Sequence, residues 1–229
     1  MRFMYMDIYY LILVIPAMLL AMIAQIKVKS TYSKFSQVRN VRGITGAQAA
    51  QQLLAYYGIN DVTIRPIAGK LTDNYNPKTK VLSLSQSNFS GTSIAAVGVA
   101  CHEVGHAIQH ATDYYPIKVR SALVPVANIG SWVGIPLALA GYVMGFHPLV
   151  SIGLMLYSLI AIFQFVTLPV EFNASSRAIK AIEEQGLLYE DETQSAKKVL
   201  SAAAMTYVAS LVVSLANLLR LFLRFNNRR

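Results

Sequence analysis

Residues Ser121 to Val170 read SALVPVANIGSWVGIPLALAGYVMGFHPLVSIGLMLYSLIAIFQFVTLPV, a stretch without a single Asp, Glu, Lys or Arg. Its length is enough for two helical crossings of the roughly 30 Å hydrocarbon layer of a bilayer. Near its middle the run is broken by Gly145-Phe146-His147-Pro148, a sequence typical of a turn. We therefore predict a transmembrane helical hairpin over residues 121–170.

Two further apolar runs flank this hairpin in the chain. Ile8 to Ile26 carries no charge, and it is too long, and too close to Asp7, for a cleaved signal peptide. It predicts a transmembrane anchor over residues 1–27. Leu200 to Leu219 is also long enough to span, and predicts an apolar helix within a C-terminal segment of residues 200–229. A hydrophobic fraction of 55% agrees, because it is too high for an average soluble domain.

The positive charge of the chain is concentrated after the first apolar run. Eleven of the 20 basic residues lie between Lys27 and Arg120, against four acidic residues. This pattern is typical of a segment kept on the cytoplasmic side of a membrane, and we expect no nucleic-acid partner. The basic residues at the C-terminal end do not follow this charge rule, because four crossings would place them outside the cell. They are Arg220, Arg224, Arg228 and Arg229. Either the last helix does not cross fully, or the charge rule fails here.

The segment of residues 28–120 carries the start, stop and turn signals of a folded membrane-proximal α/β region. The signals are a capping box at Thr45-Gly-Ala-Gln48, a helix stop at Gly58, strands at Val62–Pro66 and Lys80–Ser85, the turn-rich connection LTDNYNPKT, and a helix cap at Ser90-Gly91-Thr92-Ser93. The second strand, KVLSLS, either offers a free edge to an extended peptide or is only structural.

The helix that follows contains ACHEVGHAIQHA, residues 100–111. His102 and His106 are four residues apart, about 40° in projection and 6 Å in rise, so both imidazoles can reach one ion. Glu103 is one residue beyond His102, about 100° further around the helix, so it can reach a metal-bound water without being a ligand itself. His110 lies roughly 12 Å along the axis from His102 and cannot share that ion on a straight helix. Cys101 is interpreted as a small packing residue.

The pattern H-E-x-x-H also occurs by chance, and buried structural histidines are the alternative. That alternative must place two imidazoles and a carboxylate on a strongly apolar helix, where unpaired polar groups are costly. The extended motif is absent, since Gln109 and Thr112 occupy its glycine and histidine positions, so a third ligand must come from elsewhere. Glu171 is the first charged residue after the hairpin. Because a hairpin crosses the membrane twice, its end returns to the face where it began, so Glu171 and His102 lie on the same side of the membrane. Alternatively, Glu171 only marks a helix end at the interface.

HEVGHAIQHA, a hairpin and LPVEFNASSRA together resemble the bacterial neutral zinc metallopeptidases of the YugP type, over nearly the whole chain. The motif pair is also similar to HtpX-like and CAAX-prenyl membrane proteases. This resemblance implies one zinc ion held by His102, His106 and Glu171, with Glu103 as catalytic acid/base. One position departs from the wider relatives, which usually have an aspartate where this chain has Ser175. In those relatives such a carboxylate could orient a metal-binding histidine. In this chain another group must orient the histidine, or the orientation must be weaker.

The expected fold class is a mainly α, multi-span helical membrane protein with a small zincin-like or gluzincin-like α/β metallopeptidase domain at one membrane face. Residues 171–199 would form the helix carrying the third ligand. The expected function is that of a zinc endopeptidase in the cell membrane, with its site on the cytoplasmic face and a zinc-activated water that Glu103 deprotonates. Candidates for stabilising the oxyanion, each with a purely structural alternative, are Tyr75, His110 and Arg177.

The expected partners are the lipid bilayer and a peptide or protein substrate, membrane proteins included. The competing interpretation is a catalytically inactive zinc-binding membrane scaffold or an ion-handling protein. Charged pathways inside the membrane would favour ion handling, but the predicted spans contain no ionisable carboxylate or lysine.

Overall fold

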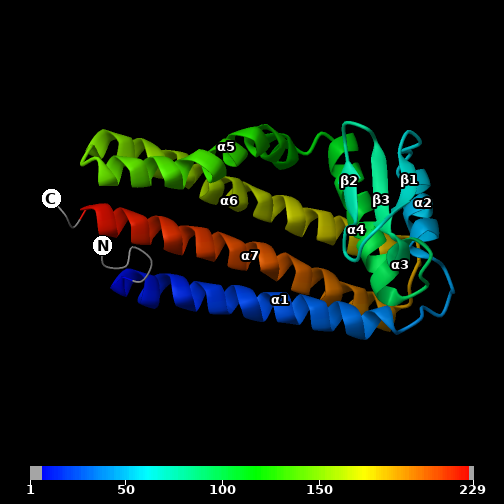
Figure 1. Cartoon of the computed structure of the whole chain (residues 1–229). Helices are drawn as coiled ribbons and strands as arrows, with labels where there is room; N and C mark the ends of the chain where they lie inside the picture. The colour runs from blue at the N-terminus through cyan, green and yellow to red at the C-terminus, as the bar shows by residue number, and fades with distance from the viewer. Residues whose placement is uncertain (1–6, 227–229) are drawn as a thin grey trace. The chain divides into compact units, whose positions relative to one another are not determined.

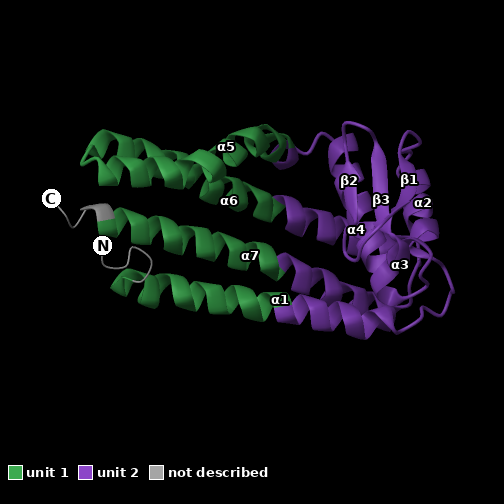
Figure 2. Ribbon diagram, in the orientation of Figure 1, with its two compact units in different colours: residues 1–25, 118–169, 205–229 green, residues 26–117, 170–204 purple. Residues whose placement is uncertain are grey.

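The structure, a computed structural model, describes residues 7–226, and these are mainly helical (Figure 1). In chain order the elements are a π-helical turn at Tyr10–Val14, α1 (Ile15–Ser36), α2 (Gly46–Tyr56), β1 (Thr63–Ile67), β2 (Asn74–Asn76), β3 (Val81–Ser85), α3 (Gln86–Phe89), α4 (Ile94–Ala111), α5 (Tyr115–Val143), α6 (His147–Glu184) and α7 (Glu190–Asn226). The chain divides into two compact units (Figure 2): unit 1 is residues 1–25, 118–169 and 205–229, and unit 2 is residues 26–117 and 170–204.

Among the described residues, four helices are long and apolar enough to cross a membrane. They are Tyr10–Ser36, Tyr115–Val143, His147–Glu184 and Glu190–Arg224. The predicted hairpin of residues 121–170 falls within α5 and α6, which are separated at the expected break, where Gly145 has a φ of 69°. α5 begins before the predicted hairpin, and α6 continues beyond it to Glu184. The chain is therefore a mainly α membrane protein with a small α/β region, as the sequence predicted.

Within unit 1, the backbones of α5 and α6 approach each other closely at glycines. A Cβ atom on Gly130 would overlap the backbone of Leu156, and one on Gly153 would overlap the backbone of Ala138. Membrane helices associate through such close packing because lipid provides no hydrophobic force between them. Pro125 and Pro136 are both accommodated inside α5.

An ion cluster joins the two terminal helices of unit 1. Arg220 Nε lies 3.2 Å and Arg224 Nη1 2.5 Å from Oδ2 of Asp7, and the Arg220 guanidinium lies 4.7 Å from the ring centre of Tyr10. These side chains must share one membrane face, which corresponds to an even number of crossings. The cluster thus favours a complete crossing by α7, while Arg228 and Arg229 lie outside the described residues.

Unit 2 contains a three-stranded sheet of order β1-β3-β2 (Figure 1). β1 runs parallel to β3, and β2 runs antiparallel to it. The stretch LTDNYNPKT is therefore not only a connection: its central Asn74–Asn76 forms β2, although Asn is depleted in strands, because pairing with β3 overrides that preference. β3 is the central strand of this sheet, which favours the structural interpretation of KVLSLS.

The predicted caps of the helices in unit 2 are confirmed. Thr45 and Gln48 form the capping box of α2, and the Ser93 side chain accepts a hydrogen bond from the amide of Ala96 at the start of α4. Gly58 follows α2 with a φ of 67°. The core beneath these elements buries α4 against α2 and the sheet, with fully buried side chains that include Leu53, Leu82, Leu84, Val97 and Val104.

Candidate metal centre

The site is built on α4 and on the part of α6 that belongs to unit 2. A Cβ atom on Gly105 would lie 2.5 Å from the carbonyl oxygen of Ala174, so only glycine permits this approach of the two helices. Ala174 is three residues beyond Glu171, which places the Glu171 carboxylate almost one helical turn from the contact. The glycine inside HEVGH thereby brings Glu171 to the histidines.

Three side chains converge here. The Nε2 atoms of His102 and His106 lie 3.4 Å and 3.6 Å from the same carboxylate oxygen, Oε2 of Glu171. The two rings are nearly perpendicular, at 83°, with centres 4.9 Å apart. A tetrahedral zinc ion with ligand bonds of about 2.0–2.1 Å separates neighbouring ligand atoms by about 3.3 Å. Two imidazole nitrogens and one carboxylate oxygen therefore fit a zinc ion in both type and spacing.

Gln109 holds the His106 ring. Its Nε2 donates to the backbone carbonyl of Val170 at 2.8 Å, so its Oε1 faces His106 Nδ1, at 3.0 Å. An amide oxygen only accepts, so Nδ1 of His106 carries a proton, and Nε2, which faces Glu171, is the ring nitrogen left to bind a metal ion. Gln109 is fully buried and also ties α4 to the residue just before Glu171. One side chain thus orients one candidate ligand and positions another.

Further polar side chains extend this support. Asn173 Oδ1 accepts from Gln109 Nε2 at 3.0 Å and from Arg177 Nε at 2.8 Å. The Arg177 guanidinium lies 5.7 Å from the ring centre of Tyr114. Ser175 Oγ lies 3.1 Å from His102 Nδ1. At the position where the wider relatives have aspartate, a neutral hydroxyl therefore makes the contact with the histidine.

Glu103 lies beside this group without belonging to it. It is almost completely buried on α4, and it is absent from the three side chains whose ligand atoms converge. Burial raises the pKa of the Glu103 carboxyl above its ordinary value, while the imidazoles of His102 and His106 act in the opposite direction. A carboxyl group in such surroundings is suited to exchanging a proton with a nearby water.

The other residues singled out in the sequence lie outside the converging group of the described chain. The His110 ring packs on Tyr75, with ring centres 5.8 Å apart, and Arg177 is held by Asn173 and Tyr114. Their role at an oxyanion stays a prediction. Cys101 is fully buried in the core, and burial raises the pKa of its thiol, in agreement with a packing role.

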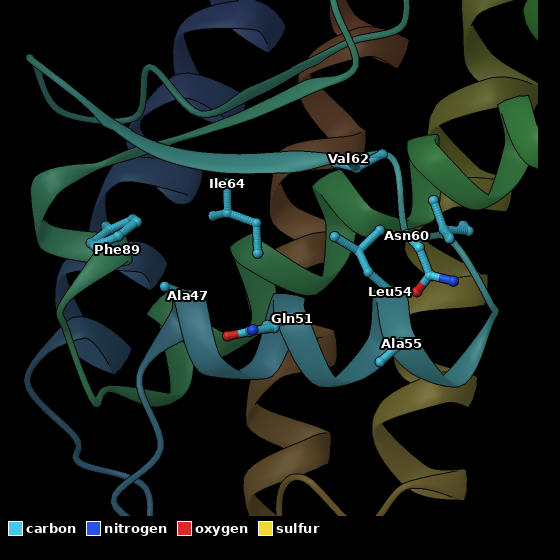
Figure 3. Close-up of a pocket in the computed structure, with 9 residues that line it drawn as sticks. Ala47, Gln51, Leu54, Ala55, Asn60, Val62, Ile64 and Phe89 are labelled. Carbon is cyan, nitrogen blue, oxygen red and sulfur yellow. The ribbon is translucent and has the colours of Figure 1, made fainter.

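A separate hollow of about 390 Å³ lies between α2 and β1 (Figure 3). It is lined by Ala47, Gln51, Leu54, Ala55, Ile59, Asn60, Val62, Ile64 and Phe89. None of these side chains titrates or is a usual metal ligand. This hollow is therefore not a second candidate metal centre.

Comparison with known proteins adds the family. The family described as "Putative neutral zinc metallopeptidase" matches residues 10–226 of the chain. The chain belongs to this zinc metallopeptidase family. A relative from Bacillus subtilis (strain 168), "Putative membrane protease YugP", is 44% identical over 220 residues, which cover 96% of this chain and 98% of that protein. No solved structure matches this metallopeptidase chain. The resemblance found in the sequence is thus confirmed, and family membership implies zinc as the metal.

The sequence analysis missed the contacts of Gln109 and Asn173 at the candidate metal centre. Gln109 was considered only as a departure from an extended motif. A signal was nonetheless present, because Gln109 follows His106 by three residues and must share its helix face. For Asn173 the only hint was its place between Glu171 and Ser175, and its contact with Gln109 is visible only in the folded chain.

Proposed function

We propose that this chain is a membrane-embedded zinc endopeptidase in which His102, His106 and Glu171 hold the metal and Glu103 is the general base. One observation carries the proposal: two imidazole nitrogens lie 3.4 Å and 3.6 Å from one carboxylate oxygen. Membership of a zinc metallopeptidase family and similarity to a membrane protease support the class of reaction.

A bound zinc ion would polarise the scissile carbonyl and lower the pKa of a water molecule toward about 7. The residues of the chain do the rest. Glu103 accepts the proton of the attacking water and delivers it to the departing amine. Its position one residue after His102 keeps it near the site but outside the converging ligand atoms. Gln109 and Ser175 hold the histidine rings in the orientation that binding requires.

The substrate is proposed to be a peptide in an extended conformation. β2 is an edge strand of the sheet in the described chain, and its Tyr75 contacts His110 on α4, the helix that carries the candidate site. Backbone pairing along an edge strand binds peptides with little dependence on side chains. This arrangement would suit an enzyme that cleaves within chains of varied sequence.

The experiment that tests the base is Glu103→Gln, which keeps the size of the side chain and removes its ability to take a proton. We expect a normal zinc content and a loss of peptide hydrolysis of about 10²- to 10⁴-fold. The measurement pairs metal analysis with peptide cleavage by the purified full chain, before and after chelation and zinc return. A Glu103→Gln protein with the activity of the original would exclude this mechanism.

We further propose that the site faces the cytoplasm, on the strength of the basic residues that follow the first span, which include Lys27, Lys29, Lys34, Arg39 and Arg42. A cysteine placed at Lys78, an exposed residue of unit 2, should then resist a membrane-impermeant thiol reagent in intact cells. Labelling should appear after the cells are opened. Ready labelling of intact cells would reverse the proposed orientation.

A further inference from the structure

A second pocket of unit 2 lies where α1 ends. Its volume is about 800 Å³, and its lining comes from the end of α1, the linker that follows, the loop before β2, α3, and the segment between α3 and α4. The end of α1 is joined to α3 by Tyr32, whose hydroxyl donates to Asn88 Oδ1 at 2.7 Å. The two elements lie side by side in Figure 1.

The pocket is positively charged. Lys29, Arg39 and Lys70 line it from three separate segments, and no acidic residue is part of the lining. All three side chains are exposed, and none is paired with a carboxylate of the described residues 7–226. Seven further lining residues carry a hydroxyl: Tyr32, Ser33, Ser36, Ser87, Ser90, Thr92 and Ser93. The hydroxyls of Tyr32, Ser36 and Ser90 already donate to oxygens of the chain, which leaves the other four as donors for a ligand. Ammonium, guanidinium and hydroxyl groups together are the donors that bind a phosphate.

The pocket also lies at the depth of lipid headgroups. The apolar run of the first span ends at Ile26, and Lys29 follows three residues later on the same helix, which is about 4.5 Å along its axis. The headgroup layer extends roughly 5–8 Å beyond the hydrocarbon on each side of a bilayer. The Lys29 end of the pocket therefore falls within the layer that phospholipid headgroups occupy, while its Ser36 end, about 15 Å beyond Ile26, lies outside that layer.

An apolar side chain at the rim favours a lipid over a free anion. Leu71 lines the pocket next to Lys70, at the tip of a loop, and 45% of its surface is exposed. A basic residue beside an exposed apolar one is the combination found where a protein contacts the boundary between headgroups and acyl chains. We propose that this pocket binds the phosphate of an anionic phospholipid headgroup at the membrane face of unit 2.

The experiment compares two charge-matched double variants of the full chain in neutral detergent. Lys29→Gln with Lys70→Gln removes two charges from the pocket, and Lys27→Gln with Lys34→Gln removes two from the same juxtamembrane region outside the lining. The readout is the rise in unfolding temperature on titration with short-chain phosphatidylglycerol, because a ligand of the folded state stabilises it in proportion to its occupancy. Phosphatidylcholine and inorganic phosphate are the comparison probes.

We expect phosphatidylglycerol to raise the unfolding temperature of the original chain well above the effect of phosphatidylcholine. The pocket pair should weaken the apparent affinity by up to about thirtyfold, since one ion pair with the phosphate contributes up to a factor of about five. The control pair should change it by less than about twofold, because Lys27 and Lys34 lie outside the lining. Zinc content should be equal in all variants, which shows that they are folded.

Three results would overturn the proposal. Absence of any shift in the original chain would exclude the site. An equal loss in the two pairs would mean that diffuse charge, not the pocket, attracts the lipid. A rise in unfolding temperature with inorganic phosphate as large as that with phosphatidylglycerol would show that the pocket binds a free anion and not a lipid. The Leu71→Ser variant checks the same point: it should weaken the response to phosphatidylglycerol alone, and an unchanged response to both probes would exclude the lipid.

Discussion

Apart from the ion cluster at Asp7, the two units differ in what their polar side chains connect. In unit 1, hydroxyl groups donate to carbonyls of their own helix, as Ser158 does to Met155 and Thr167 to Phe163. In unit 2, polar side chains connect separate elements, as Gln109 does with Val170 and Asn40 with Thr92. A polar side chain surrounded by lipid has no water to bond, so it must find a hydrogen-bond partner in its own helix or in a helix packed against it. In a packed region outside the membrane, a buried polar side chain can pair with a residue far away in the sequence.

The packing of the two units differs accordingly. Unit 1 relies on backbone contact at glycines and leaves large apolar side chains exposed, such as Trp132 at 82% and Phe165 at 66%. Unit 2 has a closed core of small and branched apolar residues. The candidate metal centre therefore depends on contacts between elements of unit 2. Unit 1 should tolerate loss of the hydroxyl groups that bond only within their own helix.

The largest effect is expected from breaking the metal centre of unit 2. Glu171→Ala should lose zinc and abolish hydrolysis, because it removes a candidate ligand and leaves two imidazoles facing an empty position. The loss of zinc affinity should exceed the about 10- to 100-fold that follows removal of an outer partner. His110→Ala is the control and should keep its metal. Zinc analysis of both purified variants decides the matter, and the reverse result would make His110 the ligand.

A smaller effect is expected from the residues that orient the histidines. Gln109→Leu should weaken zinc binding by about 10- to 100-fold. The His106 ring loses the oxygen that accepts its Nδ1 proton, and α4 loses its hydrogen bond to the carbonyl of Val170. Ser175→Ala should cost less, because its hydroxyl makes a single contact with His102 and connects nothing else to the site. Competition with a chelator measures both. Equal affinities in Gln109→Leu and the original chain would remove Gln109 from its positioning role.

The smallest effect on the metal is expected from unit 1. Gly153→Val should lower the free energy of unfolding by about 1–3 kcal/mol through overpacking against α5, and leave zinc content unchanged. Ser158→Ala, five residues further along α6, should change stability by less than about 0.5 kcal/mol, because its hydroxyl serves only its own helix. Thermal unfolding in detergent compares the two. A loss of zinc in Gly153→Val would contradict the separation of tasks between the units.

Much of this could be predicted because the signals are local. The uncharged run, its break at Gly145 and the caps at Thr45 and Ser93 each act over a few residues, so the spans and helix starts were predictable. The spacing of His102 and His106 is also local. In contrast, two of the three residues of β2, Asn74 and Asn76, disfavour strands, and β2 forms because β3 is present to pair with it.

The support of the candidate site lay beyond prediction for the same reason. The contact between Gln109 and Val170 spans 61 positions, and that between Ser175 and His102 spans 73. Nothing in either segment alone indicates its partner. The aspartate missing at Ser175 suggested a weaker or different support for His102, and its physical form, a hydroxyl at 3.1 Å, is seen only in the structure.

The burial of Cys101 has a practical consequence for labelling. It is the one cysteine of the chain, its side chain is enclosed in the core, and burial raises the pKa of its thiol. The thiolate is the species that reacts with alkylating reagents, and here it is both disfavoured and out of reach. The native protein therefore behaves as a cysteine-free background, in which a thiol introduced anywhere on the surface would carry the only fluorophore or spin label.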